Sequence, residues 1–326
     1  MDESAFTKAN RDNWNASSKA YQADHHAELE GDVLWGPSMP PERELRILGE
    51  SVLGEDILEI ACGGGQSAVH LATMGARVTA VDFSKAQLEH ARAFARSKNA
   101  SVRFLEADVQ DLSMLDHGSF EIAFSAYALG FVEDIRRTFR EVARVLRPGG
   151  LFAFSWMSPF FAMTEERGLL VKRSYFDRSP IVFEEKDGTE VDFHRTYGDW
   201  HRALTDAGFI VTDILEPEPL PRENTYADVF PLSKIQMIPG TTIWRALNPA
   251  PSDAMEERRE AHGWRCRHDA FSAGRAYRVP AAVTMSCWWT VVGTNSKPNH
   301  QVTDCSWFVS VHTAWNTSLE PTARCV

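Results

Sequence analysis

Short apolar runs alternate with amphipathic segments along the first 250 residues of the chain. The apolar runs have the length of buried strands, whereas the segments between them repeat apolar positions every three or four residues, as helices do. Residues 84–97, for instance, bring Leu88, Ala91 and Phe94 onto one helical face. The strands predicted in this way are 56–60, 77–81, 102–106, 120–124, 151–155, 209–215 and 241–246. Strands and helices that alternate in this order favour an α/β fold with a doubly wound, mainly parallel sheet.

Helical spacing predicts further elements between these strands. The predicted helices cover residues 4–22, 66–74, 84–97, 132–146 and 198–207. Another helix is expected to begin at Pro41, because proline suits a first helical position and Leu45, Leu48 and Val52 follow at helical spacing. In sheets of this kind ligands bind beyond the carboxyl ends of the strands, so candidate chemistry is sought there.

A glycine-rich turn follows the first predicted strand and contains the pattern Gly63-x-Gly65-x-x-Ala68. One interpretation is an NAD(P)-dependent oxidoreductase, with a pyrophosphate at the helix N-terminus and Asp82 on the ribose. The pattern alone is weak evidence for that class. Glu59 lies in the strand four residues before Gly63, where a pyrophosphate gains nothing from a carboxylate. A ligand that carries an amino group would gain a charge-assisted contact there.

Four segments in a fixed order carry a family resemblance. They are Glu59–Gly65, Val81–Ser84, Glu106–Val109 and Arg147–Gly150. Together they resemble the class I S-adenosylmethionine-dependent methyltransferases, and more narrowly the small-molecule type 11 group, which includes quinone and sterol methyltransferases. The resemblance spans roughly residues 5–248 and implies a seven-stranded Rossmann-like sheet with a helical N-terminal lid. It departs from the family at Ala61, where glycine is usual.

The resemblance implies S-adenosylmethionine as the methyl donor and assigns roles to the strand-end carboxylates. Glu59 supports the methionine ammonium through the loop, Asp82 accepts both ribose hydroxyls, and Asp108 accepts the adenine amine. The other expected cofactor-binding residues are Tyr21, Ala61, Gly63, Gly65, Gln66, Phe83, Ala107, Val109, Ser125 and Ala126.

Methyl transfer from a sulfonium is an in-line displacement, so much of the rate comes from positioning the acceptor in a dry site. A base is needed only where the acceptor must lose a proton. We expect His194 and Tyr127 as catalytic candidates, and Trp35, Tyr127 and His194 as substrate-binding residues. The insertion over residues 156–197 is rich in aromatic and apolar side chains. This composition indicates a hydrophobic or aromatic acceptor pocket, although an ordinary packed cap has the same composition.

Charge and composition limit the other partners. The net charge of −11 disfavours nucleic acid, because there is no basic excess to neutralise phosphates. No apolar run approaches the ~20 residues that span a bilayer, so no membrane insertion is expected. The N-terminus lacks the features of a signal peptide, so a cytoplasmic location is expected. Cysteine and histidine spacing includes no Cys-x-x-Cys pair, so no metal site is expected. The oligomeric state does not follow from the sequence.

The composition changes near residue 250. Most of the acidic excess precedes this point, whereas four of the five cysteines follow it: Cys266, Cys287, Cys305 and Cys325. We therefore expect a methyltransferase domain over residues 1–250 and a loosely ordered C-terminal extension over residues 251–326. The expected activity is methyl transfer from S-adenosylmethionine to a small molecule. An oxidoreductase and a non-catalytic S-adenosylmethionine-binding module remain the alternatives.

Overall fold

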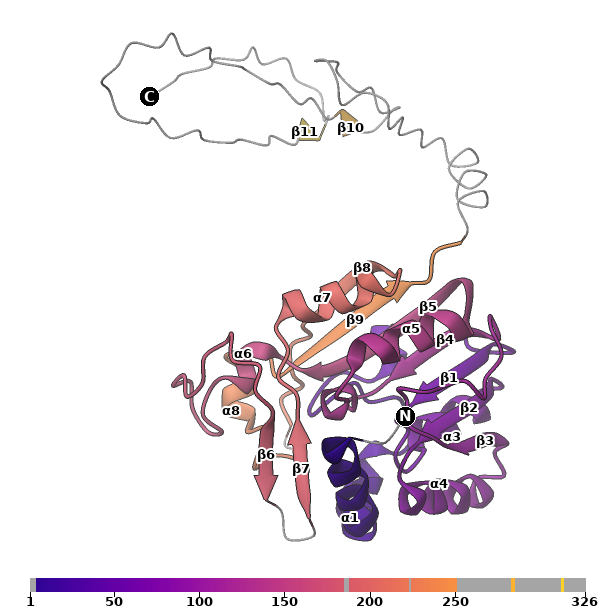
Figure 1. Ribbon diagram of the computed structural model, residues 1–326, viewed down its shortest axis with the longest axis horizontal. Coiled ribbons are helices and arrows are strands. Elements are labelled where there is room, and N and C mark those ends of the chain that lie inside the picture. The colour runs from indigo at the N-terminus through magenta and orange to yellow at the C-terminus, as the bar shows by residue number, and fades with distance from the viewer. Residues whose placement is uncertain (1–3, 185–187, 223, 251–282, 285–311, 314–326) are drawn as a thin grey trace. The chain divides into compact units, whose positions relative to one another are not determined.

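A computed structural model describes residues 4–184, 188–222 and 224–250, together with the paired two-residue strands β10 (Val283–Thr284) and β11 (His312–Thr313) (Figure 1). The chain divides into two units after Ala250, and the fold below is that of the first unit. Apart from β10 and β11, the expected C-terminal extension lies outside the described residues.

A seven-stranded sheet forms the centre of the first unit (Figure 1). Its spatial order is β3-β2-β1-β4-β5-β9-β8, and β9 runs antiparallel to the other six strands. The strands are β1 (Asp56–Ile60), β2 (Arg77–Asp82), β3 (Val102–Glu106), β4 (Phe120–Ser125), β5 (Leu146–Met157), β8 (Ile210–Leu215) and β9 (Thr241–Leu247). The predicted α/β fold with a mainly parallel sheet is therefore confirmed. Chain order reverses between β1 and β4, which opens a binding crevice at their carboxyl ends.

Helices cover both faces of this sheet because its strands are apolar on both sides. Neighbouring residues of β1 separate accordingly: Ile57 belongs to one buried cluster and Leu58 to the other. The helices of the first unit are α1 (Ala5–Leu29), α2 (Glu42–Leu45), α3 (Gln66–Thr73), α4 (Lys85–Ser97), η1 (Leu129–Phe131), α5 (Ile135–Val145), α6 (Pro159–Ala162), α7 (Tyr197–Asp206) and α8 (Leu232–Ile235). No helix among the described residues is long and apolar enough to cross a membrane.

The N-terminal helix α1 is longer than the predicted segment 4–22, because no helix breaker precedes Gly31. It begins at Ser4, whose side chain accepts the N–H of Thr7. The buried Asn10 amide donates to the carbonyls of Phe131 and Val191 and accepts from the Val191 N–H. These bonds fix α1 to η1 and to the hairpin of β6 (Ile181–Glu184) and β7 (Thr189–Asp192), as a helical lid requires.

The helix predicted from Pro41 is only one turn long, which corrects the sequence interpretation. The helix α2 ends at Arg46, which adopts a left-handed backbone with φ of 52°. The Glu42 carboxylate then accepts the N–H groups of Ile47 and Leu48, which continue as a loop. The apolar spacing beyond α2 therefore reflects burial rather than a helix.

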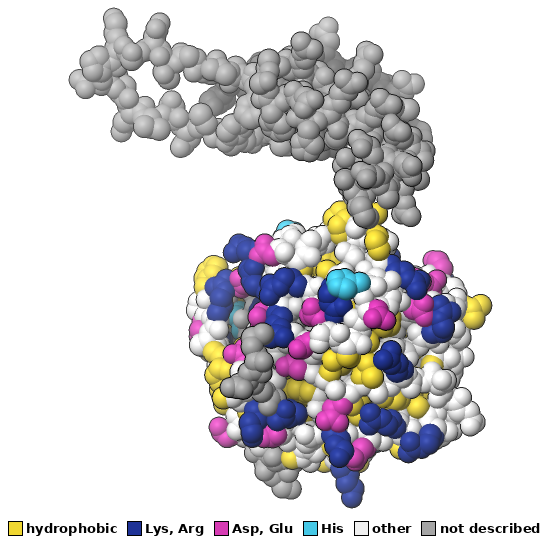
Figure 2. Space-filling model, turned by 45° about the vertical axis from the view of Figure 1, so that its right-hand side comes forward, with side chains coloured by type: hydrophobic (Ala, Val, Ile, Leu, Met, Phe, Trp, Pro, Cys, Tyr) yellow, Lys and Arg dark blue, Asp and Glu magenta, His cyan; other side chains and the backbone are white. Residues whose placement is uncertain are grey.

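The surface shown in Figure 2 carries Lys and Arg side chains interspersed with Asp and Glu. A nucleic-acid-binding surface typically has a continuous basic stripe. The face shown therefore carries mixed charge.

Candidate functional site

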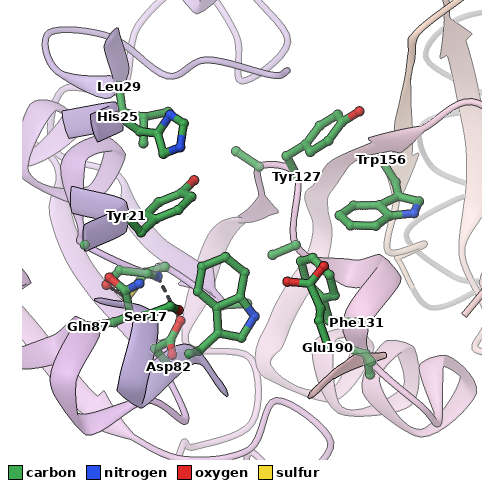
Figure 3. Close-up of a pocket in the computed structure, with 18 of the residues that line it drawn as sticks. Ser17, Tyr21, His25, Leu29, Asp82, Gln87, Tyr127, Phe131, Trp156 and Glu190 are labelled. Carbon is green, nitrogen blue, oxygen red and sulfur yellow. Dashed lines mark hydrogen bonds between the residues drawn. The ribbon is translucent and has the colours of Figure 1, made fainter. Parts of the chain in front are cut away.

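A cavity of about 570 Å³ lies at the carboxyl ends of the central strands and beneath α1 (Figure 3). This volume is in the range of small-molecule sites. Eleven of the residues predicted from the sequence line it: Tyr21, Glu59, Ala61, Gly63, Gln66, Asp82, Phe83, Asp108, Val109, Ala126 and Tyr127. Residues from α1, from the strand ends and from the 156–240 region therefore meet around one space.

Glu59 is a buried carboxylate with an oxygen that has no partner. Its side chain is 4% exposed, and Oε2 makes no hydrogen bond in the structure. The pKa of Glu59 is raised to about 8, mainly by burial and to a smaller extent by the nearby Asp82 carboxylate, whereas a hydrogen bond from the Ala68 backbone lowers it. A buried acceptor of this kind is costly unless a donor reaches it. A ligand cation at the glycine loop would satisfy it.

Asp82 ends β2 and holds the glycine loop in place. Its Oδ2 accepts the Gly63 N–H at 2.8 Å, and its Oδ1 accepts the Ser84 N–H at 2.8 Å. Burial raises the pKa of Asp82 to about 6, although these backbone donors lower it. Each carboxylate oxygen has a further lone pair, so Asp82 can also accept ligand hydroxyls in the cavity.

The glycine loop is shaped by close packing. Ala61 adopts φ of 54°, a left-handed conformation that costs a residue with a Cβ about 1–2 kcal/mol. This strain explains why glycine suits that position. Gly65 has φ of 74°, and a Cβ there would lie 2.8 Å from the Ala91 Cβ. A Cβ on Gly64 would collide with the Gln22 amide, so the absence of a side chain lets α1 approach the loop.

Polar side chains of α1 connect the lid to the floor of the cavity. Gln66 Nε2 donates to Gln22 Oε1 at 2.6 Å, and Gln22 Nε2 donates to Gln87 Oε1 at 2.8 Å. On the adjacent wall, Asp108 accepts both the backbone and the side-chain N–H of Gln110, each at 2.9 Å. These bonds fix the polar lining of the cavity on the side of the strand ends.

Aromatic rings form a continuous wall that curves around the rest of the cavity. The centroids of successive rings lie 5.0–5.7 Å apart. In order along the wall, the rings are Tyr21, Trp14, Phe131, Trp156, Tyr127 and Phe230. Figure 3 shows Tyr127, Trp156 and Phe131 facing Tyr21 and His25 across the space. The strained φ of Tyr127, 57°, aims this ring inward from the end of β4. The wall suits an apolar or aromatic ligand.

Five predicted residues do not line the cavity: Trp35, Gly65, Ala107, Ser125 and His194. Trp35 is fully buried, packs against Phe124 and donates its indole N–H to Glu42 at 2.8 Å. The structure therefore corrects the expected substrate-binding role of Trp35 to a packing role. Gly65 is buried in the glycine loop, the Ala107 N–H donates to the Asp82 carbonyl, and Ser125 is fully buried at the end of β4.

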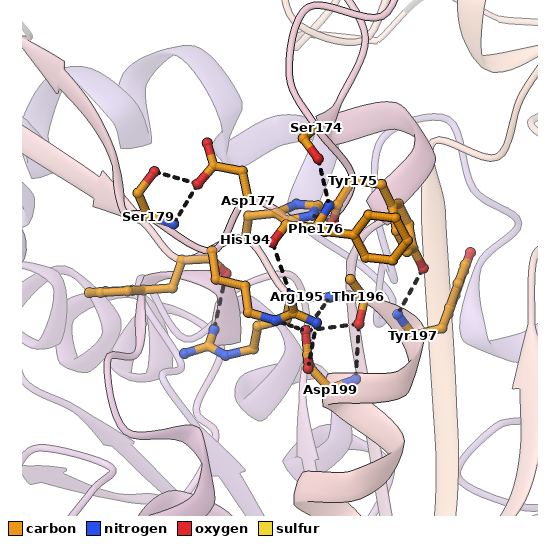
Figure 4. Close-up of polar contacts among 12 residues, drawn as sticks. Ser174, Tyr175, Phe176, Asp177, Ser179, His194, Arg195, Thr196, Tyr197 and Asp199 are labelled. Carbon is orange, nitrogen blue, oxygen red and sulfur yellow. Dashed lines mark hydrogen bonds and ion pairs between the residues drawn. The ribbon is translucent and has the colours of Figure 1, made fainter.

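His194 is also placed away from the cavity, which corrects its expected catalytic and substrate-binding roles. It is 4% exposed, and its Nε2 lies 3.0 Å from the Tyr175 carbonyl, among the contacts that join residues 174–179 to the start of α7 (Figure 4). Burial lowers its pKa. The ring is thus a buried packing group.

We expect His194→Ala to leave S-adenosylhomocysteine affinity and turnover within threefold of wild type but to reduce the free energy of unfolding by ~1–3 kcal/mol. The folded protein disfavours the protonated ring, so the stabilising contribution of His194 is lost as the pH falls below about 6.5. The difference in free energy of unfolding between wild type and His194→Ala should therefore be smaller in acid. Urea denaturation at pH 5 and pH 8 measures it. A turnover loss of a hundredfold would return His194 to the catalytic site.

Several lining residues were not predicted individually from the sequence, although three of them lie in the insertion 156–197, whose composition indicated a pocket. They include Trp14, Phe131, Trp156, Glu190, Asp192 and Tyr226. Asp192 ends β7, is 6% exposed and has an Oδ1 without a partner. Burial raises its pKa to about 7, while Arg195 lowers it. A carboxylate at the end of a hairpin strand was a detectable signal, but the hairpin itself was not predicted.

Among the described residues, no group of three or more His, Cys, Asp or Glu is placed to hold a metal ion.

Comparison with known proteins is consistent with this geometry. The family described as "Methyltransferase domain" matches residues 58–154. The uncharacterized methyltransferase YbaJ of Bacillus subtilis is 30% identical over 177 residues, which cover 51% of this chain and 69% of that protein. A ubiquinone biosynthesis O-methyltransferase of Alkalilimnicola ehrlichii is 34% identical over 105 residues, 32% of this chain and 42% of the relative. The crystal structure of an S-adenosylmethionine-dependent methyltransferase from Mesorhizobium loti superimposes with a TM-score of 0.52 at 28% identity, over 63% of this chain and 95% of that one.

Proposed function

The chain belongs to the class I S-adenosylmethionine-dependent methyltransferases, and from this premise we propose that it methylates a small-molecule acceptor held against the aromatic wall of the cavity. S-adenosylmethionine supplies, when bound, a methyl group already activated by a sulfonium. The relative whose name places it in ubiquinone biosynthesis supports an acceptor of small size. The cavity supports it as well, because it has the volume of a small-molecule site.

The residues at the strand ends fit this cofactor. The observation that carries the proposal is that Glu59, Asp82 and Asp108, at or just beyond the ends of β1, β2 and β3, line one cavity, while none of its described lining residues is Lys or Arg. A sulfonium compound with an ammonium group and ribose hydroxyls provides the donors that these acceptors need. The pyrophosphate of NAD would instead add two negative charges beside Glu59.

The remaining residues position the acceptor and exclude water. The side chains of Trp14, Phe131 and Trp156 enclose the space opposite the strand ends, and α1 covers it. Such a site keeps the acceptor atom oriented for in-line attack and free of competing water. All described lining residues lie within residues 1–250, so we propose that this segment is the complete catalytic domain.

Thermal denaturation with two ligands tests the proposed function. S-adenosylhomocysteine at a concentration 100 times its dissociation constant should stabilise the protein by about 2.7 kcal/mol and raise Tm, whereas NAD at the same concentration should leave Tm unchanged. Mass spectrometry of small molecules incubated with S-adenosylmethionine should then detect a gain of one methyl group. Stabilisation by NAD alone would contradict the proposal and favour the oxidoreductase alternative.

A further inference from the structure

The carboxylates of the cavity fall into two groups. Glu59, Asp82 and Asp108 belong to the strand ends, whereas Glu190 and Asp192 come from β7 in the hairpin. Figure 3 shows Glu190 beside Phe131, across the cavity from Asp82 and Gln87. The second group therefore lies on the side of the aromatic wall, where the acceptor is expected.

Buried oxygens without partners mark the same side. Asp192 Oδ1 and Asn13 Oδ1 are both buried, line the cavity and make no hydrogen bond. Glu28, which lines the cavity from α1, already accepts the N–H and hydroxyl of Thr225. The acceptor side thus offers hydrogen-bond acceptors that a ligand can satisfy.

No described cation forms an ion pair with Asp192. Arg195 and Arg173 both act electrostatically on Asp192. The Arg195 guanidinium donates to the backbone carbonyls of Leu129, Val132, Glu133 and Phe193, and Arg173 forms its ion pair with Asp177. Arg195 also stacks over Trp200, 5.0 Å from the ring centroid. The Oδ1 atom of Asp192, which has no hydrogen-bond partner, is therefore left for a ligand.

Aromatic faces and a carboxylate oxygen without a partner together select for one kind of ligand. Ring faces attract cations, and the attraction strengthens in a desolvated site. A buried carboxylate without a partner gains most from an N–H donor that carries charge or develops it. An anionic acceptor, in contrast, would place like charges together in a low-dielectric space.

We propose that the acceptor is an amine on an aromatic or apolar body, held by Asp192 through an N–H bond and methylated at that nitrogen. This inference rests on the proposed methyltransferase function. The bound ammonium first gives one proton to the Asp192 carboxylate, which frees the nitrogen lone pair. That lone pair forms the new C–N bond while the bond from methyl carbon to sulfur breaks and leaves its electron pair on sulfur. The positive charge that the nitrogen regains lies beside Asp192, and the proton on Asp192 is released to solvent when the product leaves. Asp192 is accordingly a catalytic residue.

Binding of three matched probes to the protein saturated with S-adenosylhomocysteine tests the proposal. The probes share one ring system: 2-naphthylmethylamine, 2-naphthylmethanol and 2-naphthoate. Isothermal titration should show the amine binding at least tenfold more tightly than the alcohol, and the carboxylate should not bind. Asp192→Asn should remove the preference for the amine and leave alcohol affinity within twofold.

Two further variants complete the experiment. Glu190→Gln, on the same hairpin strand, should weaken amine binding at least threefold, which provides a second test if Asp192→Asn does not fold. Glu218→Gln changes an exposed carboxylate away from the cavity and should alter nothing. Mass spectrometry with S-adenosylmethionine should detect N-methylation of the amine.

The outcomes distinguish the amine proposal from the methyltransferase function on which it rests. Three results would overturn the amine proposal. They are equal affinities for the amine and the carboxylate, an unchanged preference for the amine over the alcohol in both hairpin variants, and no binding of any probe. Failure of S-adenosylhomocysteine itself to bind would instead overturn the proposed function.

Discussion

Replacing Asp82 with alanine should weaken binding of S-adenosylhomocysteine by at least tenfold. The carboxylate lies buried at the end of β2 and lines the cavity. Two ribose hydroxyls that donate to a charged acceptor contribute more than ~1.4 kcal/mol together, which is one decade in affinity. The same substitution removes the acceptors of the Gly63 and Ser84 N–H groups, so the glycine loop loses its anchor as well. Both losses weaken the binding of S-adenosylhomocysteine.

Isothermal titration calorimetry at pH 7.5 provides the measurement, and Asp116→Ala provides the control. Asp116 is an exposed aspartate outside the cavity, so its loss should leave the dissociation constant within twofold. Because the pKa of Asp82 is raised to about 6, the wild-type affinity should also fall as the pH drops through 6, where the acceptor becomes protonated. An unchanged dissociation constant in Asp82→Ala would mean that the ribose lies elsewhere.

The cofactor half of the site follows from local sequence. A strand of four to seven residues is recognisable by its apolar run, and the residue at its end is then known to within one position. Asp82 and Asp108 could be located in this way, because parallel strands bring their carboxyl ends to one edge of the sheet. Their assignment to a particular ligand came from the family resemblance.

The acceptor half depends on contacts that periodicity does not encode. Trp14 and Trp156 are separated by more than 140 residues in the sequence, yet both pack against Phe131. Trp35 resembled a pocket residue because it lies in a loop rich in glycine and proline, but its indole N–H is taken by Glu42. Which aromatic ring lines a cavity and which fills a core is decided by tertiary packing alone. The hairpin that carries Asp192 was missed for the same reason.

Glu59 shows that the requirements of binding and stability conflict at this site. The unfolded chain ionises this carboxyl near the ordinary glutamate pKa of 4.5, whereas burial raises the pKa in the folded protein to about 8. For a carboxyl with a raised pKa, the stabilising contribution is complete below the unfolded pKa and is lost as the pH rises through the folded one. At pH 7 the folded protein without ligand therefore retains a proton that the unfolded chain has released, at a cost of ~3 kcal/mol.

Glu59→Gln should consequently be more stable than wild type and bind its cofactor more weakly. The amide does not titrate, so its stability advantage should grow from near zero at pH 4.5 toward ~3 kcal/mol at pH 7. Without a negative charge for the ligand ammonium, the affinity for S-adenosylhomocysteine at pH 8 should fall at least tenfold. Urea denaturation without ligand and calorimetry with ligand measure the two effects. Glu106→Gln, an exposed glutamate at the end of β3, should change neither. Parallel stability profiles for Glu59→Gln and wild type between pH 5 and pH 8 would show that the Glu59 carboxyl is already ionised in the folded protein, and unchanged affinity would show that the ammonium does not depend on it.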